Sequence, residues 1–294
     1  MNTLILKNIS KTYANGVKAL DGVNLTITNG MFGLLGANGA GKSSLMRTIA
    51  ALQKPTGGSV IFNDLDIVKT PQAVRMALGF LPQEFGVYPK ISAQELLNYL
   101  AILKGINNKK ERKEQVETLL QQTNLYQHRK KSVYTFSGGM KQRFGIAQAL
   151  LGTPKLIIVD EPTAGLDPEE RNRFLNLLSE IGKHIIVILS THIVEDVQEL
   201  CKQMAILSKG KIIAVGNPTD LVSTIAGKVW RKPIAKAELP TYQEKYRVIS
   251  TQLVGGDTLI KVLSGSQPSS GFELTNAGLE DYYFSQTHLH HSSN

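Results

Sequence analysis

Eight consecutive residues have the types and spacing of a loop that binds phosphate: Gly36-Ala37-Asn38-Gly39-Ala40-Gly41-Lys42-Ser43. Glycines permit backbone conformations and close approaches that a Cβ would block, so successive N–H groups can point at phosphate oxygens. Lys42 would neutralise the β- and γ-phosphates of a nucleotide, Ser43 would ligate Mg²⁺, and Ser44 would add a phosphate contact. The alternative is a glycine-rich turn with an exposed lysine. The apolar run at 31–35 and the helical pattern after Lys42 favour the phosphate loop.

Two adjacent acids follow a second apolar run, at 156–159, which predicts a strand buried on both faces. Asp160 would hold Mg²⁺ directly or through water, and Glu161 would polarise the attacking water as a general base. The alternative is a strand end followed by a polar turn, which Pro162 and Thr163 could support. Together with the phosphate loop, the second carboxylate favours hydrolysis by a base in the same chain. A switch GTPase would instead use a glutamine to orient the water.

A third element lies between these motifs: Phe136-Ser137-Gly138-Gly139-Met140-Lys141-Gln142-Arg143. Ser137 fits the N-cap of a helix that runs to about residue 151. Gly138 and Gly139 would then lie in the first turn, where each costs up to ~1 kcal/mol relative to alanine. Glycines there let another surface approach the bare N–H groups of a helix N-terminus, which favour anions. Because residues 36–43 already provide one phosphate site, the sequence favours a second site that serves a nucleotide bound to another copy.

The third element resembles the signature motif of ATP-binding-cassette (ABC) ATPases, and the resemblance extends over residues 1–220. In that family the motif of one protomer closes over ATP held by the phosphate loop of the other. Phe136 and Met140 depart from the family's usual leucine and glutamine, and Ala164-Gly165 is a smaller change. The resemblance implies a homodimer, or a dimer with a paralogous ABC subunit, that shares its ATP sites.

The resemblance also assigns roles to single residues outside the three motifs. Tyr13 would stack on adenine, Gln83 would link the two lobes, sense the γ-phosphate and ligate the metal, and His192 would be the switch histidine. Asp167, in Gly165-Leu166-Asp167, would meet the partner protomer. The implied catalytic set is therefore Lys42, Gln83, Glu161 and His192.

Each of these residues also has an ordinary structural interpretation. Tyr13 could be an aromatic residue at a strand end, and Gln83 alone indicates little. Asp167, Pro168 and Glu170 have the types of a helix N-cap, first and third positions. His192 could be a capping or core histidine, but it follows the apolar run at 185–189, so it would lie beside the phosphates.

These motifs can form one site only in a fold that brings the ends of several strands close together. Strand and helix patterns alternate at 156–182 and 185–203, which predicts a parallel sheet covered by helices. Ligands bind at the carboxyl ends of such strands, where the motifs fall. We therefore expect an α/β fold of the P-loop NTPase type, with a RecA-like parallel core. A small antiparallel layer would precede it at 3–30, and a helical subdomain would be inserted at about 84–153.

The expected domains are an ABC ATP-binding domain at 1–220 and a small α+β accessory region at 221–294. In the latter, Gly255-Gly256-Asp257 between two β-prone runs predicts a hairpin. The tail residues His288, His290 and His291 could bind a metal, but a disordered tail is the favoured interpretation.

Composition and charge indicate where in the cell the protein works and what its surface could bind. The 294 residues carry a net charge of +9 and a single cysteine, Cys201, which excludes an intrachain disulfide. No apolar run approaches the ~20 residues of a membrane-spanning helix, and the N-terminus lacks the pattern of a signal peptide. We expect a cytoplasmic protein. Residues 84–153 hold eleven Lys and Arg against five Asp and Glu, which indicates either a solvated face or a surface for anionic lipid or nucleic acid.

Two functions remain open. The favoured one is the energy-coupling subunit of a transporter, peripheral on the inner face of the cell membrane, whose integral permease is a separate chain. Phe85, Val87 and Tyr88 are then candidates for the groove that docks the permease. Residues 90–106 and 278–284 resemble the antibiotic and multidrug export branch, which favours export and a bacterial origin. The alternative is a non-transport ABC ATPase acting on nucleic acid or ribosomes, but no basic tail interleaved with aromatic residues supports it.

Overall fold

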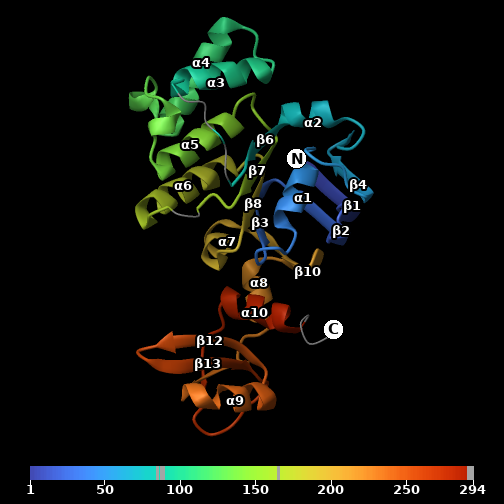
Figure 1. Ribbon diagram of the computed structural model, residues 1–294, viewed down its shortest axis with the longest axis vertical. Helices are drawn as coiled ribbons and strands as arrows, with labels where there is room; N and C mark the ends of the chain where they lie inside the picture. Colours follow the sequence, from blue (N-terminus) through green and yellow to red (C-terminus); the bar gives the residue numbers. More distant parts are fainter. Residues whose placement is uncertain (84–85, 87–89, 164–165, 290–294) are drawn as a thin grey trace. The chain divides into compact units, whose positions relative to one another are not determined.

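The computed structural model describes the whole chain except residues 84–85, 87–89, 164–165 and 290–294. The chain forms two compact units, Met1–Ile212 and Ile213–Asn294 (Figure 1). Each unit has its own hydrophobic core. The sequence-based boundary at residue 220 lies further along the chain, inside α8 (Pro218–Ser223).

The first unit begins with an antiparallel sheet in the order β2-β1-β4-β5. Its strands are β1 (Thr3–Thr12), β2 (Lys18–Thr28), β4 (Gly57–Phe62) and β5 (Leu65–Asp66). Alternation along β1 buries Leu4 and Leu6 on one face. The pairing of β1 with β2 shifts register between Leu6 and Ile9, where Asn8 has a φ of 52°, and this bulge keeps Ile9 on the buried face. These strands form the antiparallel layer expected from the sequence.

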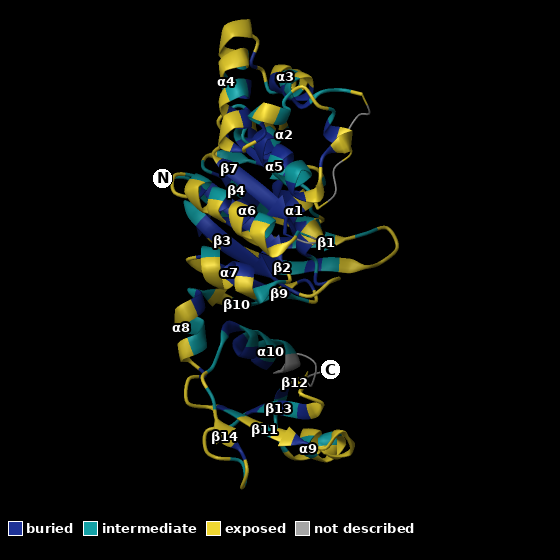
Figure 2. Ribbon diagram, turned by 90° about the vertical axis from the view of Figure 1, so that its left-hand side faces the viewer, coloured by how far each residue is buried: buried dark blue, intermediate teal, exposed yellow. Residues whose placement is uncertain are grey.

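A second sheet has the order β10-β9-β3-β8-β7-β6, and its strands from β9 to β6 pair in parallel. Its strands are β3 (Gly30–Leu35), β6 (Leu78–Leu81), β7 (Leu156–Asp160), β8 (Ile186–Thr191), β9 (Gln203–Ser208) and the edge strand β10 (Lys211–Gly216). Every residue of β7 is buried, as its continuous apolar sequence predicts (Figure 2). The carboxyl ends of β3, β6, β7 and β8 share one edge, and the motif residues follow those ends.

Helices cover both faces of the parallel sheet (Figure 1). One face carries α5 (Gly138–Ala149), α6 (Pro168–Ile181) and α7 (Val194–Leu200), and the other carries α1 (Lys42–Ile49). Because α1 also contacts β2, its buried Leu45 and Ile49 join one core with strands of both sheets. That core fixes the start of α1, and with it the phosphate loop, against the strand ends.

The helical part of the unit contains α3 (Ala93–Leu103), α4 (Lys109–Gln122) and α5. Ser92 begins α3 with a capping box. Apolar side chains at helical spacing, among them Leu97, Val116 and Leu120, are fully buried in a core of their own. α5 joins this core to the sheet by packing on β6.

The second unit combines an antiparallel sheet, in the order β12-β13-β11-β14, with helices. Its further elements are β11 (Val229–Ile234), α9 (Leu239–Lys245), β12 (Val248–Val254), β13 (Asp257–Leu263), β14 (Glu273–Leu274) and α10 (Leu279–Leu289). Gly255 and Gly256 form the predicted hairpin turn at positive φ. Lys261 Nζ donates a hydrogen bond to the buried Asp281 at 2.8 Å, which ties α10 to β13. The expected α+β character is confirmed.

Candidate active site

The phosphate loop joins the end of β3 to the start of α1. Two of its glycines are required by the chain's own packing. A Cβ on Gly36 would lie 2.5 Å from the carbonyl oxygen of Leu207, and one on Gly41, whose φ is 108°, would lie 2.4 Å from that of Ala19. Gly39 has a φ of 80°, and no described residue lies within 4 Å of the place of its Cβ. The backbone at Gly39 is therefore open to a ligand.

Three of the predicted catalytic residues meet through one carboxylate. Lys42 Nζ lies 3.1 Å from Glu161 Oε1, and His192 Nδ1 lies 2.6 Å from Glu161 Oε2. Lys42 Nζ also donates to the carbonyl oxygens of Gly36, at 2.7 Å, and Ala37, at 3.3 Å. Lys42 and Glu161 are buried, whereas the His192 side chain is 47% exposed. The carboxylate of Glu161 therefore links the phosphate loop to the solvent-facing histidine.

The strand ends set this geometry. β8 pairs in parallel with both β3 and β7, so Glu161 and His192 follow neighbouring strands at the edge where α1 begins. Glu161 has a φ of 50°, a left-handed conformation that is uncommon outside glycine. Its N–H donates to the carbonyl oxygen of Ser190 at 2.8 Å. This turn directs the carboxylate across the strand ends toward Lys42.

The end of β7 also carries polar atoms suited to a divalent cation. Asp160 Oδ1 and Ser190 Oγ are buried without a hydrogen-bond partner among the described residues, and the two residues are neighbours in the sheet. The described part of the chain has no cluster of three or more His, Cys, Asp or Glu that could hold a metal alone, and His290 and His291 lie outside it. Mg²⁺ prefers hard oxygen ligands and commonly binds through one or two carboxylates together with substrate phosphates. The residues therefore fit a cation that arrives with a nucleotide.

Tyr13 connects the antiparallel sheet to α1. Its hydroxyl lies 3.0 Å from Ser44 Oγ and donates to Gln53 Oε1 at 3.2 Å. Lys11 Nζ lies 5.5 Å from the centre of the ring. The residue predicted to stack on adenine is thus half-buried beside the predicted phosphate ligand Ser44, and its stacking stays a prediction.

The other predicted ligands surround the loop and the neighbouring strand end. Ser43 is exposed in the first turn of α1, and Gln83 is exposed just after β6. Asn38 is exposed, while Ala40 is buried and its N–H donates to the carbonyl oxygen of Ala37 at 3.1 Å. These positions are compatible with the roles predicted from the sequence, which stay predictions.

Ser137 is the N-cap of α5, and its Oγ accepts a hydrogen bond from the Met140 N–H at 3.3 Å. The two glycines after it differ. A Cβ on Gly139 would lie 2.5 Å from Glu170 Oε2 on α6, so any other residue there would force the Glu170 side chain to move. Around Gly138, no described residue lies within 4 Å of the place of the Cβ. The contact of Gly139 with Glu170 was not predicted from the sequence. The binding of an outside ligand at this helix start stays a prediction, and Gly138 is the glycine that supports it.

The two departures from the signature pattern are residues of the helical core. Phe136 is buried and packs edge-on against Phe144, with ring centres 6.4 Å apart, and Met140 packs against the same core. Both substitutions therefore contribute to folding without altering Ser137 or the glycines.

Asp167 is the N-cap of α6. Its Oδ1 accepts a hydrogen bond from the Glu170 N–H at 2.9 Å, and Pro168 occupies the first turn. The structural interpretation given from the sequence is thus confirmed. The role of Asp167 at a partner protomer stays a prediction, and Ala164 and Gly165 lie outside the described residues.

A buried acid that sequence reasoning missed supports the surrounding loops. Asp196 in α7 is fully buried and accepts hydrogen bonds from Thr163 Oγ1, at 2.6 Å, and from Arg171 Nε, at 2.8 Å. It ties the segment after β7 and the start of α6 to the helix after β8. No local pattern marks it, because Asp196 lies in a polar first turn beside Glu195. Burial and the nearby Asp196 raise the pKa of the Cys201 thiol to about 12.

Comparison with known proteins decides the family. A sequence profile described as "ABC transporter" matches residues 20–164. The linearmycin resistance ATP-binding protein LnrL of Bacillus subtilis (strain 168) is 36% identical over 224 residues, which cover 75% of this chain and 71% of LnrL. The chain belongs to the ABC transporter family. The methionine import ATP-binding protein MetN 1 of Oenococcus oeni is 38% identical to this ABC subunit over 230 residues, which cover 75% of the chain and 65% of MetN 1.

A solved structure agrees with the fold of the ABC subunit. A dimeric ATP-binding cassette in a post-hydrolysis state, bound to ADP and Pi, matches with a TM-score of 0.67 and 28% identity over 73% of this chain and 98% of that one. The predicted P-loop NTPase fold is confirmed, and so is the prediction of an ATPase that binds ATP and ADP. The chain is an ATP-binding subunit of an ABC transporter.

Proposed function

We propose that this ABC subunit hydrolyses ATP to drive export through a permease on a separate chain. The observation that carries the proposal is the contact of the Glu161 carboxylate with both Lys42 and His192. This contact supports Glu161 as the general base, because it lies between the lysine predicted to bind phosphates and the histidine predicted to sense them.

The ion pair of Lys42 with Glu161 suggests an order of steps, in which ATP binds before Glu161 acts as a base. Lys42 Nζ pairs with one of the two carboxylate oxygens of Glu161. ATP phosphates carry more negative charge than one carboxylate, so they take Lys42 and release Glu161. Glu161 then accepts a proton as water attacks the γ-phosphorus, the bond from that atom to the β–γ bridging oxygen breaks, and ADP and phosphate form. His192 would stabilise the charge on the γ-phosphate oxygens.

Asp160, Ser43 and Gln83 would hold a Mg²⁺ ion that arrives with ATP. When bound, the cation neutralises charge on the β- and γ-phosphates. The buried and unpartnered Oδ1 of Asp160 supports this assignment.

A second copy, or a paralogous ABC subunit, would complete each site. Ser137 and Gly138 are exposed at the N-terminus of α5, and Asp167 is exposed at the start of α6. The N–H groups of a helix N-terminus favour an anion, and the ADP-bound cassette with the same fold is dimeric. We infer that Ser137 and Gly138 close over ATP held by Lys42 of the other copy.

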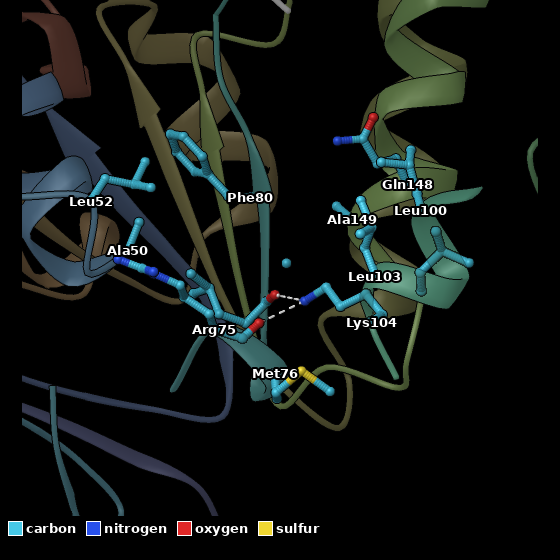
Figure 3. A pocket seen from close by; sticks show the side chains of 13 residues that line it. Ala50, Leu52, Arg75, Met76, Phe80, Leu100, Leu103, Lys104, Gln148 and Ala149 are labelled. Atoms are coloured by element: carbon cyan, nitrogen blue, oxygen red, sulfur yellow. Dashed lines mark hydrogen bonds between the residues drawn. The ribbon is translucent and has the colours of Figure 1, made fainter. Parts of the chain in front are cut away.

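An apolar groove offers a docking place for the permease. It has a volume of about 350 Å³ and is lined by residues of β6, α2 (Pro71–Ala77), α3 and α5 and of the segment after α1 (Figure 3). Met76 and Leu103 on its rim are 46% and 78% exposed, so apolar surface is offered to a partner. Lys104 Nζ donates to the carbonyl oxygens of Arg75 and Leu78, and burial lowers the pKa of this lysine. A short apolar helix of a permease is the proposed occupant.

The position of this groove agrees with the sequence-based proposal that residues after Gln83 dock the permease. Phe85, Val87 and Tyr88 themselves lie outside the described residues. Among those that are described, no helix is both long enough and apolar enough to cross a membrane. We place the subunit in the cytoplasm, peripheral on the inner face of the membrane, where the exposed Lys109, Lys110 and Lys113 would face anionic lipid.

The names of two relatives bear on the direction of transport. LnrL is named for resistance to linearmycin, which favours export, whereas MetN 1 is named for methionine import. The short resemblance of residues 278–284 to the efflux branch favours export as well.

The test reconstitutes the chain with the membrane protein encoded by the neighbouring gene. We expect a stable complex in proteoliposomes with faster ATP hydrolysis, and loss of the gene should make cells more sensitive to a toxic compound. Loss of uptake instead would reverse the direction. ATP hydrolysis stimulated by RNA or ribosomes, without binding to any permease, would favour the non-transport alternative.

A further inference from the structure

A second cleft of the first unit is not used by the proposed function. Its volume is about 710 Å³, and it is lined by one face of α4, by the segment after α5, and by the end of α6 with the residues that follow it. It shares no lining residue with the groove of Figure 3, and none of its lining residues belongs to the nucleotide site.

The floor of this cleft is apolar. Leu119 is buried, and Leu150, Leu177, Ile181 and Ile185 are half-buried, so part of each side chain still faces the opening. Contiguous apolar surface inside a hollow is a common mark of a binding site.

The rim of the cleft is acidic, although the chain as a whole is basic. Glu111 and Glu114 on α4 and Glu180 on α6 line it and are exposed. None of the three takes part in the ion pairs found among the described residues. The lysines of α4, Lys109, Lys110 and Lys113, do not line the cleft. Two of the three acids of α4 therefore line the cleft, and none of these three lysines does.

The spacing of the lining residues shows that the cleft is elongated. On α4 they recur every three or four positions from Glu111 to Gln122, which is one helix face. Eleven steps along a helix span about 16 Å, or roughly three turns. A groove of that length with an apolar floor suits a docked helix better than a compact ligand.

We propose that this cleft binds a cationic amphipathic helix of a partner protein. Apolar side chains of that helix would cover Leu177 and Ile181, and Lys or Arg residues one turn apart would face Glu111 and Glu114. The proposal does not depend on transport, because it rests on the lining of the cleft and on the charges around it.

The test measures binding of a fluorescent 18-residue peptide, built of Leu and Lys at helical spacing, to the full chain by anisotropy. Replacing the three rim acids with glutamine should weaken binding by about 3- to 150-fold, because each exposed pair contributes about 0.2–1 kcal/mol. A matched control removes the same charge outside the cleft, through Glu117→Gln, Glu199→Gln and Glu244→Gln, and should bind as the parent does. Leu177→Ser tests the floor and should also weaken binding.

Two results would overturn the proposal. In the first, the rim variant and the matched control lose affinity equally, which would show attraction by net charge alone. In the second, tetraphenylphosphonium, a compact lipophilic cation, binds in a manner that depends on the rim acids while the peptide does not bind. That result would make the cleft a small-molecule site. Thermal melts and ATPase rates of the glutamine variants should match those of the parent, since these exposed acids form no ion pair with any residue that the structure describes.

Discussion

The N-termini of α1 and α5 both lie next to glycines, which precede α1 and begin α5, yet their surroundings differ. Before α1, a Cβ on Gly36 or Gly41 would lie within 2.5 Å of backbone oxygen, and Lys42 is buried against Glu161. At α5, Ser137 and Gly138 are exposed, and no described residue lies within 4 Å of the place of a Cβ on Gly138. One helix start is enclosed by its own chain, and the other faces outward.

The difference indicates which half of the active site a single chain can assemble by itself. One half is formed around the start of α1, and the other is the start of α5. Lys42, Glu161 and His192 are already in contact, so this half needs only the nucleotide. The outward-facing half offers the N–H groups of a helix N-terminus, which favour an anion. We expect it to act only when another copy brings ATP to it. Substitutions in the two halves test this contrast, and the one expected to change turnover most is at Glu161.

Glu161→Gln should have the largest effect. The glutamine keeps the size of the side chain but cannot accept the proton, so ATP turnover should fall by about 10²–10⁴-fold, the usual contribution of a general base. Because hydrolysis no longer opens the shared sites, an ATP-bound dimer should accumulate. Phosphate release and light scattering measure the two effects, with Glu199→Gln as a control. A monomer at saturating ATP would show that the two helix starts never share a nucleotide.

Lys42→Ala should weaken nucleotide binding by about 10- to 100-fold, since hydrogen bonds to charged groups contribute roughly 1.5–3 kcal/mol each. It removes the ammonium group that the enclosed half already holds in place. Calorimetric titration with ATP measures the change. Lys69→Ala, at a side chain that is 82% exposed, is the control and should bind as the parent does. Equal affinity of the Lys42 variant would remove the phosphate loop from the site.

The two glycines of α5 should respond in opposite ways. Gly139→Ala should lower the free energy of unfolding by about 1–3 kcal/mol, because its Cβ would overlap Glu170. Gly138→Ala should raise that free energy by up to ~1 kcal/mol, the helix preference of alanine over glycine, and yet lower the ATPase rate. Urea unfolding and phosphate release separate the two effects. Full ATPase activity of the Gly138 variant would mean that no second surface approaches α5.

The smallest effect on hydrolysis is expected from charge reversal at Lys109, Lys110 and Lys113. These lysines lie in α4, away from both helix starts, so the basal ATPase rate should not change. Binding to anionic vesicles should weaken, because each lysine near such a surface contributes about 1 kcal/mol. Arg112 is left unchanged, since its Nη1 donates to the carbonyl oxygens of Ile106 and Asn107. Unaltered sedimentation with vesicles would identify α4 as a solvated face.

Sequence patterns predicted the parallel sheet and the meeting of Lys42, Glu161 and His192, because parallel strands bring the residues after their carboxyl ends to one edge. They did not predict that one carboxylate joins the other two residues. That contact depends on the left-handed backbone at Glu161, which no local pattern encodes. The closeness of Gly139 to Glu170 was missed for a similar reason, since Glu170 belongs to another helix.

The burial of Asp196 also could not be predicted from the local sequence. Its sequence context is a polar first turn of a short helix, typical of a solvated acid. Its burial follows from two partners, Thr163 and Arg171, that the chain brings to it only after folding. Contacts between residues that are far apart in the sequence therefore become visible only in the folded structure.

The closure of the second unit by α10 has a consequence for synthesis of the chain. Asp281 pairs with Lys261, and Tyr282 and Ser285 are buried, so this unit is complete only with its last helix. On the ribosome, the first unit can fold while the second is being made. At about 5–20 residues per second, the roughly 80 residues of the second unit take about 4–16 s to synthesise. Every new chain therefore passes through a stage in which a finished ATPase unit is attached to an open one, and that stage is when chaperones and proteases can act on it.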